Sequence, residues 1–486
     1  TMWASEALND AYELGFNNDK LPLVQLTNKN ASIAIKSSSG ISERRSIQDV
    51  IMQGTVWAGM LCTSTMDKLG KLVYNNDHMA YKYRGKVAVP PLEMVDDVLT
   101  ISKCGTTAVA MNALVNSFMY SKKLQLNKSK CSKIHIGSKC DHCPQLFVQG
   151  DKMKSQEREK YLGDIIHSNG KQHATVVARV AEGYGILANI RALLDDIPLG
   201  HRRTQIGLQL RQAWLINGVL YNSEVWQKIT DKDLSDLNKL DKNLLRFILG
   251  THSKSPTEQL YLETSSLNPT QIISPRRMIY LQTILQRPEG ELIRRVYEEM
   301  KADPIKDDWS QLVLGDFKEV NLSINDDQIR QMSQTDYKNL VKQKVREAAY
   351  IDFKEQQAGH EKGRLLEHID LLKHQGYLLT NLLTNKQTSL LYNLRSQSVS
   401  GIRNNFHRQY QDIRCQLCML EIDSQSHILH CPVILNQFDG PSNLPYEYIH
   451  GNLEEQVSIT ILYSSLLEVR ERLLDEGQGP RGLAPE

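Results

Sequence analysis

The sequence predicts an α+β protein whose first part mixes helices with short strands and whose remainder is mostly helical. Up to about Gly170, short apolar runs alternate with turns and helical stretches, a pattern typical of a compact α+β domain. From about Thr175 onward, the apolar residues follow helical spacing. A chain of 486 residues with 41% hydrophobic residues can bury a large core, and its length suits roughly two to four domains.

Composition limits the classes of protein to which the chain can belong. The 58 basic and 56 acidic residues nearly cancel, so only local clusters of charge could indicate nucleic-acid binding. The eight cysteines are too sparse for a disulfide scaffold, and most lie near histidines, which favours reduced, metal-capable thiols in an intracellular protein. We find no apolar run of about 18 residues and no secretory leader, so no membrane association is expected.

The clearest helices are predicted in the second half. Thr230 to Asp233 resembles a capping box, and leucines at helical spacing follow it up to Gly250, a natural helix end. Asn268-Pro269 begins another helix, and a long charged helix is predicted from Thr335 to Gln357. The stretch 301–327 is acidic and rich in turns, which predicts a linker.

Two adjacent acids, Asp96 and Asp97, interrupt an apolar run from Met94 to Leu99. The apolar arms on either side predict a hairpin that displays the acids. Burial of both charges would cost several kcal/mol each without a cation or hydrogen bonds, so the pair indicates a metal site; an ordinary Asp-Asp turn is the alternative. Magnesium binds carboxylate and phosphate oxygens, and two such ions serve nucleotidyl transfer, so the pair fits polymerase chemistry.

A second metal site is predicted near the C-terminus, where Cys415, Cys418, His427 and Cys431 form a Cys-x2-Cys-x8-His-x3-Cys pattern. Three thiolates and one imidazole satisfy tetrahedral zinc, and a small hairpin with one helical turn can supply all four ligands. His430 is the alternative fourth ligand, but spacing favours His427. A chance cluster of reduced cysteines is the competing explanation.

Cations and aromatic residues alternate just before this cluster, which suits single-stranded nucleic acid because cations neutralise phosphate and rings stack on bases. The alternative is a solvated helix face with core aromatics. The candidate contacts are Arg395, Arg403, Phe406, Arg408 and Tyr410.

A further group of possible ligands, Cys131, His135, Cys140 and Cys143, lies in the first half of the chain. Its spacing could also hold zinc, but Cys143-Pro144 is equally compatible with a segment that binds no metal. Whether this group binds a metal is left open. The sequence contains no glycine-rich phosphate loop, Gly-x-Ser-x-Gly elbow or His-Glu-x-x-His helix that would indicate a different enzyme class.

Taken in the order in which they occur along the chain, the motifs resemble those of a non-LTR (LINE-like) retrotransposon reverse transcriptase. Asp96-Asp97 resembles the palm signature of the family, and Gln53-Gly54 resembles a segment that lies against the nucleotide and template. Lys130 resembles a lysine that approaches the triphosphate. Tyr161-Leu162-Gly163 resembles the primer-grip hairpin, and the Cys-Cys-His-Cys pattern a C-terminal knuckle found in many relatives.

The resemblance implies a partial palm, built as an antiparallel sheet with helices, then a helical thumb and a C-terminal helical region with a small zinc knuckle. The domains it implies are a palm at 1–170, a thumb at 171–300, a linker at 301–327, a helical region at 328–410, a knuckle at 411–436 and a tail at 437–486.

The implied activity is RNA-directed DNA polymerisation, with Asp96 ligating magnesium and Asp97 supporting it. The implied partners are template RNA, primer or target DNA and deoxynucleoside triphosphates, with access to the nucleus. The first catalytic aspartate of the family is expected upstream of Thr1, and neither Asp10 nor Asp19 is expected to replace it, so these residues alone should not be active.

Two other hypotheses remain. A decayed or host-adopted protein could bind nucleic acid without catalysis. A structural zinc protein with an accidental acid pair would have no hairpin around Asp96.

Overall fold

The computed structural model describes residues 4–16, 19–28, 31–46, 51, 55–74, 78–137, 143–197, 202–358 and 375–477, without the side chains of 27–28, 357–358 and 406–408. The described residues combine many helices with small two-stranded sheets, so the α+β expectation is confirmed. All described strand pairs are antiparallel except β9 with β12. The chain forms two compact units, Thr1–Lys171 with Arg287–Pro304, and Gln172–Gln286 with Ile305–Glu486.

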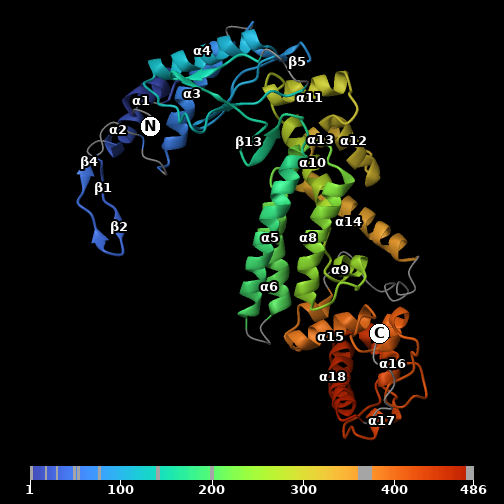
Figure 1. Ribbon diagram of the computed structural model, residues 1–486. Helices are drawn as coiled ribbons and strands as arrows, with labels where there is room; N and C mark the ends of the chain where they lie inside the picture. The colour runs from blue at the N-terminus through green and yellow to red at the C-terminus, as the bar shows by residue number, and fades with distance from the viewer. Residues whose placement is uncertain are drawn as a thin grey trace. The chain divides into compact units, whose positions relative to one another are not determined.

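The first unit contains the short strands and a few helices (Figure 1). Its elements are α1 (Ala4–Glu13), α2 (Leu21–Asn28), β1 (Ser32–Ile33), β2 (Lys36–Ser37), β3 (Gly40–Ile41), β4 (Arg45–Ser46), α3 (Ala58–Tyr74), β5 (Tyr81–Tyr83), β6 (Val87–Val89), β7 (Leu92–Met94), β8 (Asp97–Leu99), α4 (Gly105–Ser121), β9 (Ser132–Lys133), β10 (Phe147–Val148), β11 (Asp151–Lys152), β12 (Lys154–Ser155), β13 (Arg158–Tyr161), β14 (Asp164–His167) and α11 (Leu292–Ala302).

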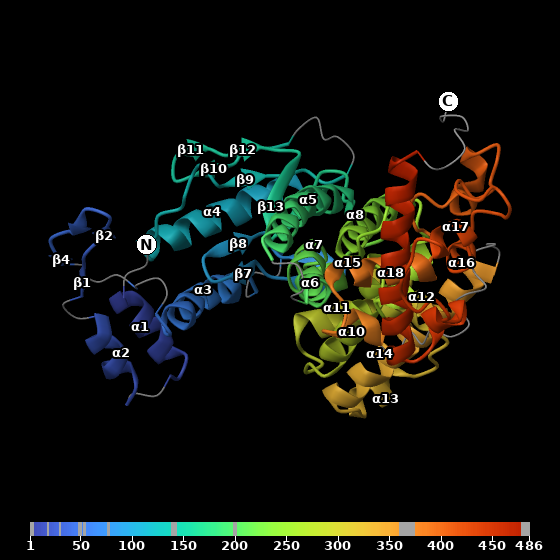
Figure 2. The ribbon, with the colours of Figure 1, turned by 90° about the horizontal axis from the view of Figure 1, so that it is seen from below.

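Helix α3 organises this unit because its buried side chains recur every four residues, at Leu61, Thr65, Leu69 and Val73. Part of that face packs on α1, and Leu69 packs with residues of α4. Val98 of β8 packs against the same cluster, so the Asp96–Asp97 hairpin is held by α3 and α4, between which it lies in Figure 2.

The second unit is helical. Its elements are α5 (His173–Asp195), α6 (Arg203–Leu210), the π-helical η1 (Arg211–Ile216), α7 (Asn217–Val219), η2 (Ser223–Val225), α8 (Asp231–Leu249), α9 (Thr257–Glu263), α10 (Pro269–Leu285), α12 (Trp309–Glu319), α13 (Asp326–Gln331), α14 (Gln334–Ala358), η4 (Gly376–Leu378), α15 (Asn385–Arg395), η5 (Arg403–Gln409), α16 (Gln425–Ile428), α17 (Pro432–Leu435), η6 (Tyr446–His450) and α18 (Leu453–Asp475).

The helices predicted from the sequence are present. Thr230 and Asp233 form the capping box of α8, and Gly250 ends it in the left-handed region at φ 61°. Asn268 caps α10, with Pro269 as its first residue, and α14 coincides with the predicted charged helix. Helices α5 and α8 pack side by side (Figure 1).

Two predicted boundaries are wrong. The predicted linker 301–327 contains α12, whose Val313 and Phe317 are buried and whose Asp316 pairs with Arg277 of α10 at 2.9 Å. The predicted tail 437–486 contains α18, which joins the core of the second unit through Tyr463 and its neighbours. Both stretches fold because their apolar residues follow helical spacing between polar ones.

The predicted thumb, 171–300, is not a separate domain. Residues 172–286 share a unit with the C-terminal region, whereas 287–304, including α11, belong with the first unit. In that unit the Arg84 guanidinium donates to the Glu299 carbonyl at 2.9 Å, which attaches α11 to the β5–β6 hairpin. No described helix is long and apolar enough to cross a membrane.

Candidate functional site

The acid pair lies at the tip of a β-hairpin, as the sequence predicts. Strands β7 and β8 pair antiparallel with Met94 opposite Asp97, which leaves Val95 and Asp96 in a two-residue turn. Val95 has φ 58°, the left-handed region in which a β-branched residue is strained. This hairpin contradicts the hypothesis of a structural zinc protein with an accidental acid pair.

Both carboxylates are exposed, which corrects the argument from burial. Their charges are solvated, so they need no bound cation for stability, yet they are accessible to a ligand. The turn itself is fixed from α3, because the Cys62 thiol donates a hydrogen bond to the Val95 carbonyl at 3.1 Å. Burial, together with the negative charge of Asp96, raises the pKa of Cys62, so this thiol keeps its donor proton at neutral pH.

Replacement of Val95 by asparagine should stabilise the first unit. Asparagine tolerates the left-handed conformation, so Val95→Asn is expected to raise the free energy of unfolding by about 1 kcal/mol. Val56→Asn is the matched control, since Val56 is also exposed but lies outside the left-handed region. Chemical denaturation of both variants measures the difference, and an equal effect of the two substitutions would contradict the assignment of strain to Val95.

The predicted primer-grip residues form a second hairpin beside the first. Tyr161 pairs with Asp164 across the β13–β14 turn, and Leu162 and Gly163 both have positive φ, at 47° and 91°, as a type I′ turn requires. The Tyr161 hydroxyl donates to the Leu92 carbonyl of β7 at 3.2 Å. Burial, followed by the charges of Asp97 and Glu93, raises the pKa of Tyr161, so the hydroxyl remains a donor.

Glu93 of β7 faces α3 and is half-buried. Burial, followed by the negative charge of Asp67, raises the pKa of Glu93 to about 7. Because the folded-state pKa lies above the unfolded value, the folded protein binds more protons between about pH 4.5 and 7, and its stability falls as the pH rises through that range.

Glu93→Gln should remove this dependence. The variant is expected to match the native protein at pH 4 and to exceed it at pH 8, on the order of 1 kcal/mol after allowance for solvent screening. Denaturation at both pH values tests the sign. A variant less stable than the native protein at pH 8 would show that the Glu93 charge is stabilised by the fold.

The other predicted nucleotide-site residues are placed only in part. Gln53 and Gly54 lie outside the described residues. Lys130 is exposed in the turn after α4, and Leu126 of the same segment packs on the cluster that supports β8. Asp10 is buried and accepts from Lys68 and Lys122 at 2.5 and 2.6 Å, so its carboxylate is occupied by a structural network.

The four residues of the predicted C-terminal metal site lie together. Their ligand atoms, from Cys415, Cys418, His427 and Cys431, all lie within 4.8 Å of one another. The two sulfur atoms of Cys415 and Cys431 are 3.9 Å apart, and the Cys418 sulfur is 3.3 Å from His427 Nε2. A tetrahedral zinc ion would hold such pairs at about 3.8 Å and about 3.6 Å, so the cluster could hold a metal such as zinc.

Local structure explains this convergence. Residues 414–422 close a tight loop, in which the Cys415 amide donates to the Glu421 carbonyl at 2.8 Å. Ser424 caps the short helix α16, which carries His427, and Cys431 caps α17. Glu421 Oε2 lies 3.1 Å from His427 Nδ1, which leaves Nε2 for a metal. His430 is exposed and belongs to no such group within the described residues, so the geometry favours His427 over His430 as the fourth ligand.

No protein-family model matches the chain, and no curated protein does either.

Contacts within the Cys415–Cys431 cluster shift the pKa values of its thiols in opposite directions. A hydrogen bond from Cys431 lowers the pKa of Cys415, and backbone N–H groups of Cys418 and Leu417 add to this effect. Conversely, the interaction with Cys415 and burial raise the pKa of Cys431.

The predicted nucleic-acid contacts need a correction. The Arg395 side chain is only 2% exposed and donates to Glu263 and to the Ile449 carbonyl, both at 2.7 Å, so its role is structural. Arg403 lies over the Tyr410 ring at 5.6 Å and donates to a backbone carbonyl at 3.1 Å. The side chains of Phe406 and Arg408 lie outside the described residues.

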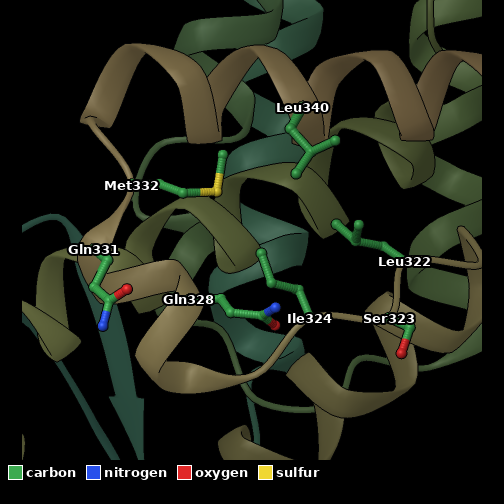
Figure 3. A pocket seen from close by; sticks show the side chains of 7 residues that line it. All are labelled: Leu322, Ser323, Ile324, Gln328, Gln331, Met332 and Leu340. Atoms are coloured by element: carbon green, nitrogen blue, oxygen red, sulfur yellow. The ribbon is translucent and has the colours of Figure 1, made fainter.

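Sequence reasoning missed the residues that hold these sites in place. Cys62 contacts Val95 directly, and Glu421 contacts His427 directly. Of the two, only Glu421 could have been found from the sequence, because it is an acid that lies between the second cysteine and the histidine of the knuckle. A pocket of about 420 Å³ in the second unit was also not expected (Figure 3). It has no ionisable side chain and is lined by Leu322, Ser323, Ile324, Gln328, Gln331, Met332 and Leu340.

Proposed function

We propose that the chain provides the palm and following helical region of an RNA-directed DNA polymerase of the non-LTR retrotransposon kind. The observation that carries the proposal is the exposed Asp96–Asp97 pair on a strained hairpin turn. Strained turns persist where the surrounding structure holds them, and they concentrate at functional sites. Here Cys62 and Tyr161 hold the hairpin backbone at two points, which fixes where the carboxylates project.

Magnesium suits this arrangement because it takes a few carboxylates together with substrate phosphates and waters. Asp96 would provide the ligand and Asp97 would support it, while Lys130 would approach the triphosphate. Two ions in such a site stabilise the attacking and leaving oxygens of nucleotidyl transfer. One acid pair cannot hold both ions, and Asp10 is engaged by two lysines, so primer extension by these 486 residues alone is not expected.

The second unit would contact template RNA and primer or target DNA. The Arg403–Tyr410 pair supports this, because a cation beside an aromatic ring suits phosphate and an unpaired base. The knuckle would hold zinc and fix the position of the neighbouring segment that carries Arg403 and Tyr410. Target-primed insertion would take place on chromosomal DNA, which requires access to the nucleus.

Iron-mediated cleavage tests the hairpin directly. Ferrous iron replaces magnesium at carboxylate sites and, with ascorbate and peroxide, cuts the chain next to the bound ion. With an RNA–DNA primer–template and a deoxynucleoside triphosphate present, we expect cleavage within residues 94–98 that is lost in Asp96→Asn. Asp151→Asn, at another exposed acid of the first unit, is the control and should keep it. Cleavage elsewhere only would reject the proposal.

One observation favours the alternative of a non-catalytic nucleic-acid-binding protein. Because Asp96 and Asp97 are exposed, they cost the fold little stability, so their presence does not argue against a chain that has lost catalysis. This alternative predicts that the chain binds the RNA–DNA hybrid equally well with Asp96→Asn and shows no iron-mediated cut at the hairpin. The same experiment therefore separates the two functions.

A further inference from the structure

A row of exposed cations follows one extended stretch of the first unit. Strands β11, β12 and β13 succeed one another between residues 151 and 161. In an extended chain, every second side chain points to the same face, and the even-numbered positions here carry positive charge over up to about 26 Å. The exposed cations of this stretch, called the 152–160 row below, are Lys152, Lys154, Arg158 and Lys160.

The odd-numbered side chains near both ends of the stretch turn toward the protein, which directs the row outward. Met153 and Glu159 are partly buried. The Glu159 carboxylate accepts a hydrogen bond from the Ser132 hydroxyl of β9 at 2.7 Å. Tyr161 continues the same inward alternation, with its hydroxyl on the Leu92 carbonyl. The cations at the even positions therefore face solvent.

The row is not neutralised by acids of the chain. Within the part of the chain that the structure describes, the side chains of Lys152, Lys154 and Arg158 make no ion pair. Asp151, the acid beside Lys152, is paired with Lys128 at 2.7 Å. These three cations are therefore available to an external anion.

The surrounding sequence strengthens this positive surface. Residues 122–171 contain 11 basic and five acidic residues, a net charge of +6, whereas the whole chain has a net charge of +2. Glu157 is exposed beside the row, but the cations outnumber it. A local excess of this size attracts an anionic partner even though the total charge of the protein is small.

Phe147 adds an aromatic ring to the same face. It lies directly opposite Lys152 in the β10–β11 hairpin, and opposite residues of an antiparallel pair share a face. The Phe147 side chain is 49% exposed. Asn112 and Asn116 of α4 both donate to the Phe147 carbonyl at 2.9 Å, so β10 is fixed on this helix, beside which it lies in Figure 2.

We propose that the 152–160 row and Phe147 bind a single strand of nucleic acid. Cations in a row neutralise successive phosphates, and an exposed ring stacks on a base. Stacking on the ring requires an unpaired base, which favours a single strand over a duplex. The surface is distinct from the Asp96–Asp97 ion site, and its binding needs no catalysis.

The salt dependence of binding tests the row. A fluorescent single-stranded oligonucleotide is titrated with the full chain, without magnesium, at several salt concentrations. Combined Lys152→Gln, Lys154→Gln and Arg158→Gln should lower the slope of log Kd against log salt concentration by about 2 and weaken binding about 100-fold at about 0.1 M salt, because each phosphate contact of a single strand contributes about 0.7 to the slope.

The matched control removes the same charge elsewhere. Combined Lys20→Gln, Lys36→Gln and Arg44→Gln changes three exposed cations of the first unit outside the row and should leave the slope nearly unchanged. Far-UV circular dichroism should be the same for both triple variants, since the substituted side chains are exposed. An equal loss of slope in the two triple variants, or no loss in either, would overturn the proposal.

Phe147→Leu tests the choice of a single strand. It should weaken binding of the single strand about tenfold with an unchanged salt slope, and it should not weaken binding of a duplex of the same sequence. An equal effect on the duplex, or a row that binds phosphatidylserine vesicles in place of the oligonucleotide, would contradict this assignment. Asp96→Asn should bind the oligonucleotide like the native protein, so this result is independent of the iron-mediated cleavage.

Discussion

Substitution of His427 by alanine is expected to destabilise the second unit by more than about 4 kcal/mol, because loss of a structural metal is among the most damaging single changes. Cys415 and Cys431 are fully buried in the main core of that unit, beside residues of α15 and α18. Without a metal, the protein would have to bury polarised thiols and an imidazole in contact with one another. A chelator should therefore reproduce the effect of the substitution in the native protein.

His430→Ala is the matched control for this prediction. His430 lies three residues away but is exposed and outside the ligand cluster, so its loss should leave both stability and zinc content unchanged. Thermal unfolding with and without chelator, followed by circular dichroism, measures the comparison. Equal effects of the two substitutions, or a native protein indifferent to chelator, would show that the cluster does not depend on a metal.

The knuckle could be predicted from the sequence because all of its determinants are local. Its ligands are close in the chain, and the hydrogen bonds that shape it come from Ser424 and Glu421 within the same stretch. The same holds for α8, because the residues that begin it at Thr230 and end it at Gly250 directly flank the helix in the sequence. Local chemistry of this kind does not depend on what the rest of the chain does.

The predictions that failed depend on partners that are distant in sequence. Arg395 lies in a stretch of cations and aromatic residues that looks the same whether it faces solvent or a core. Its partner Glu263 is 132 residues away, and no local pattern connects them. The helix contacts of the hairpin likewise depend on distant partners, because Val98 packs on side chains of α3 and α4, whereas the hairpin itself followed from its two apolar arms.

The Glu263–Arg395 ion pair should contribute the second large effect. Both side chains are buried, at 0% and 2% exposure, and Tyr377 donates to the same carboxylate at 3.0 Å. Arg395→Ala would leave the Glu263 charge buried without its cation, so a loss of about 3–5 kcal/mol is expected. Arg414→Ala is the control: Arg414 makes a similar pair with Asp412 at 2.9 Å, but both are exposed, and no measurable loss is expected.

A double substitution separates the two causes of this loss. If the cost of Arg395→Ala comes from the stranded Glu263 charge, Arg395→Met combined with Glu263→Leu should recover most of the stability, because apolar groups of similar volume tolerate burial. Chemical denaturation of the single variants Arg395→Met and Glu263→Leu and of the double variant gives the coupling energy between the two side chains. Additive losses would instead mean that packing of the Arg395 side chain against Tyr377, 5.6 Å from its ring centre, supplies the stability. The buried charge would then be a consequence of the fold and not one of its supports.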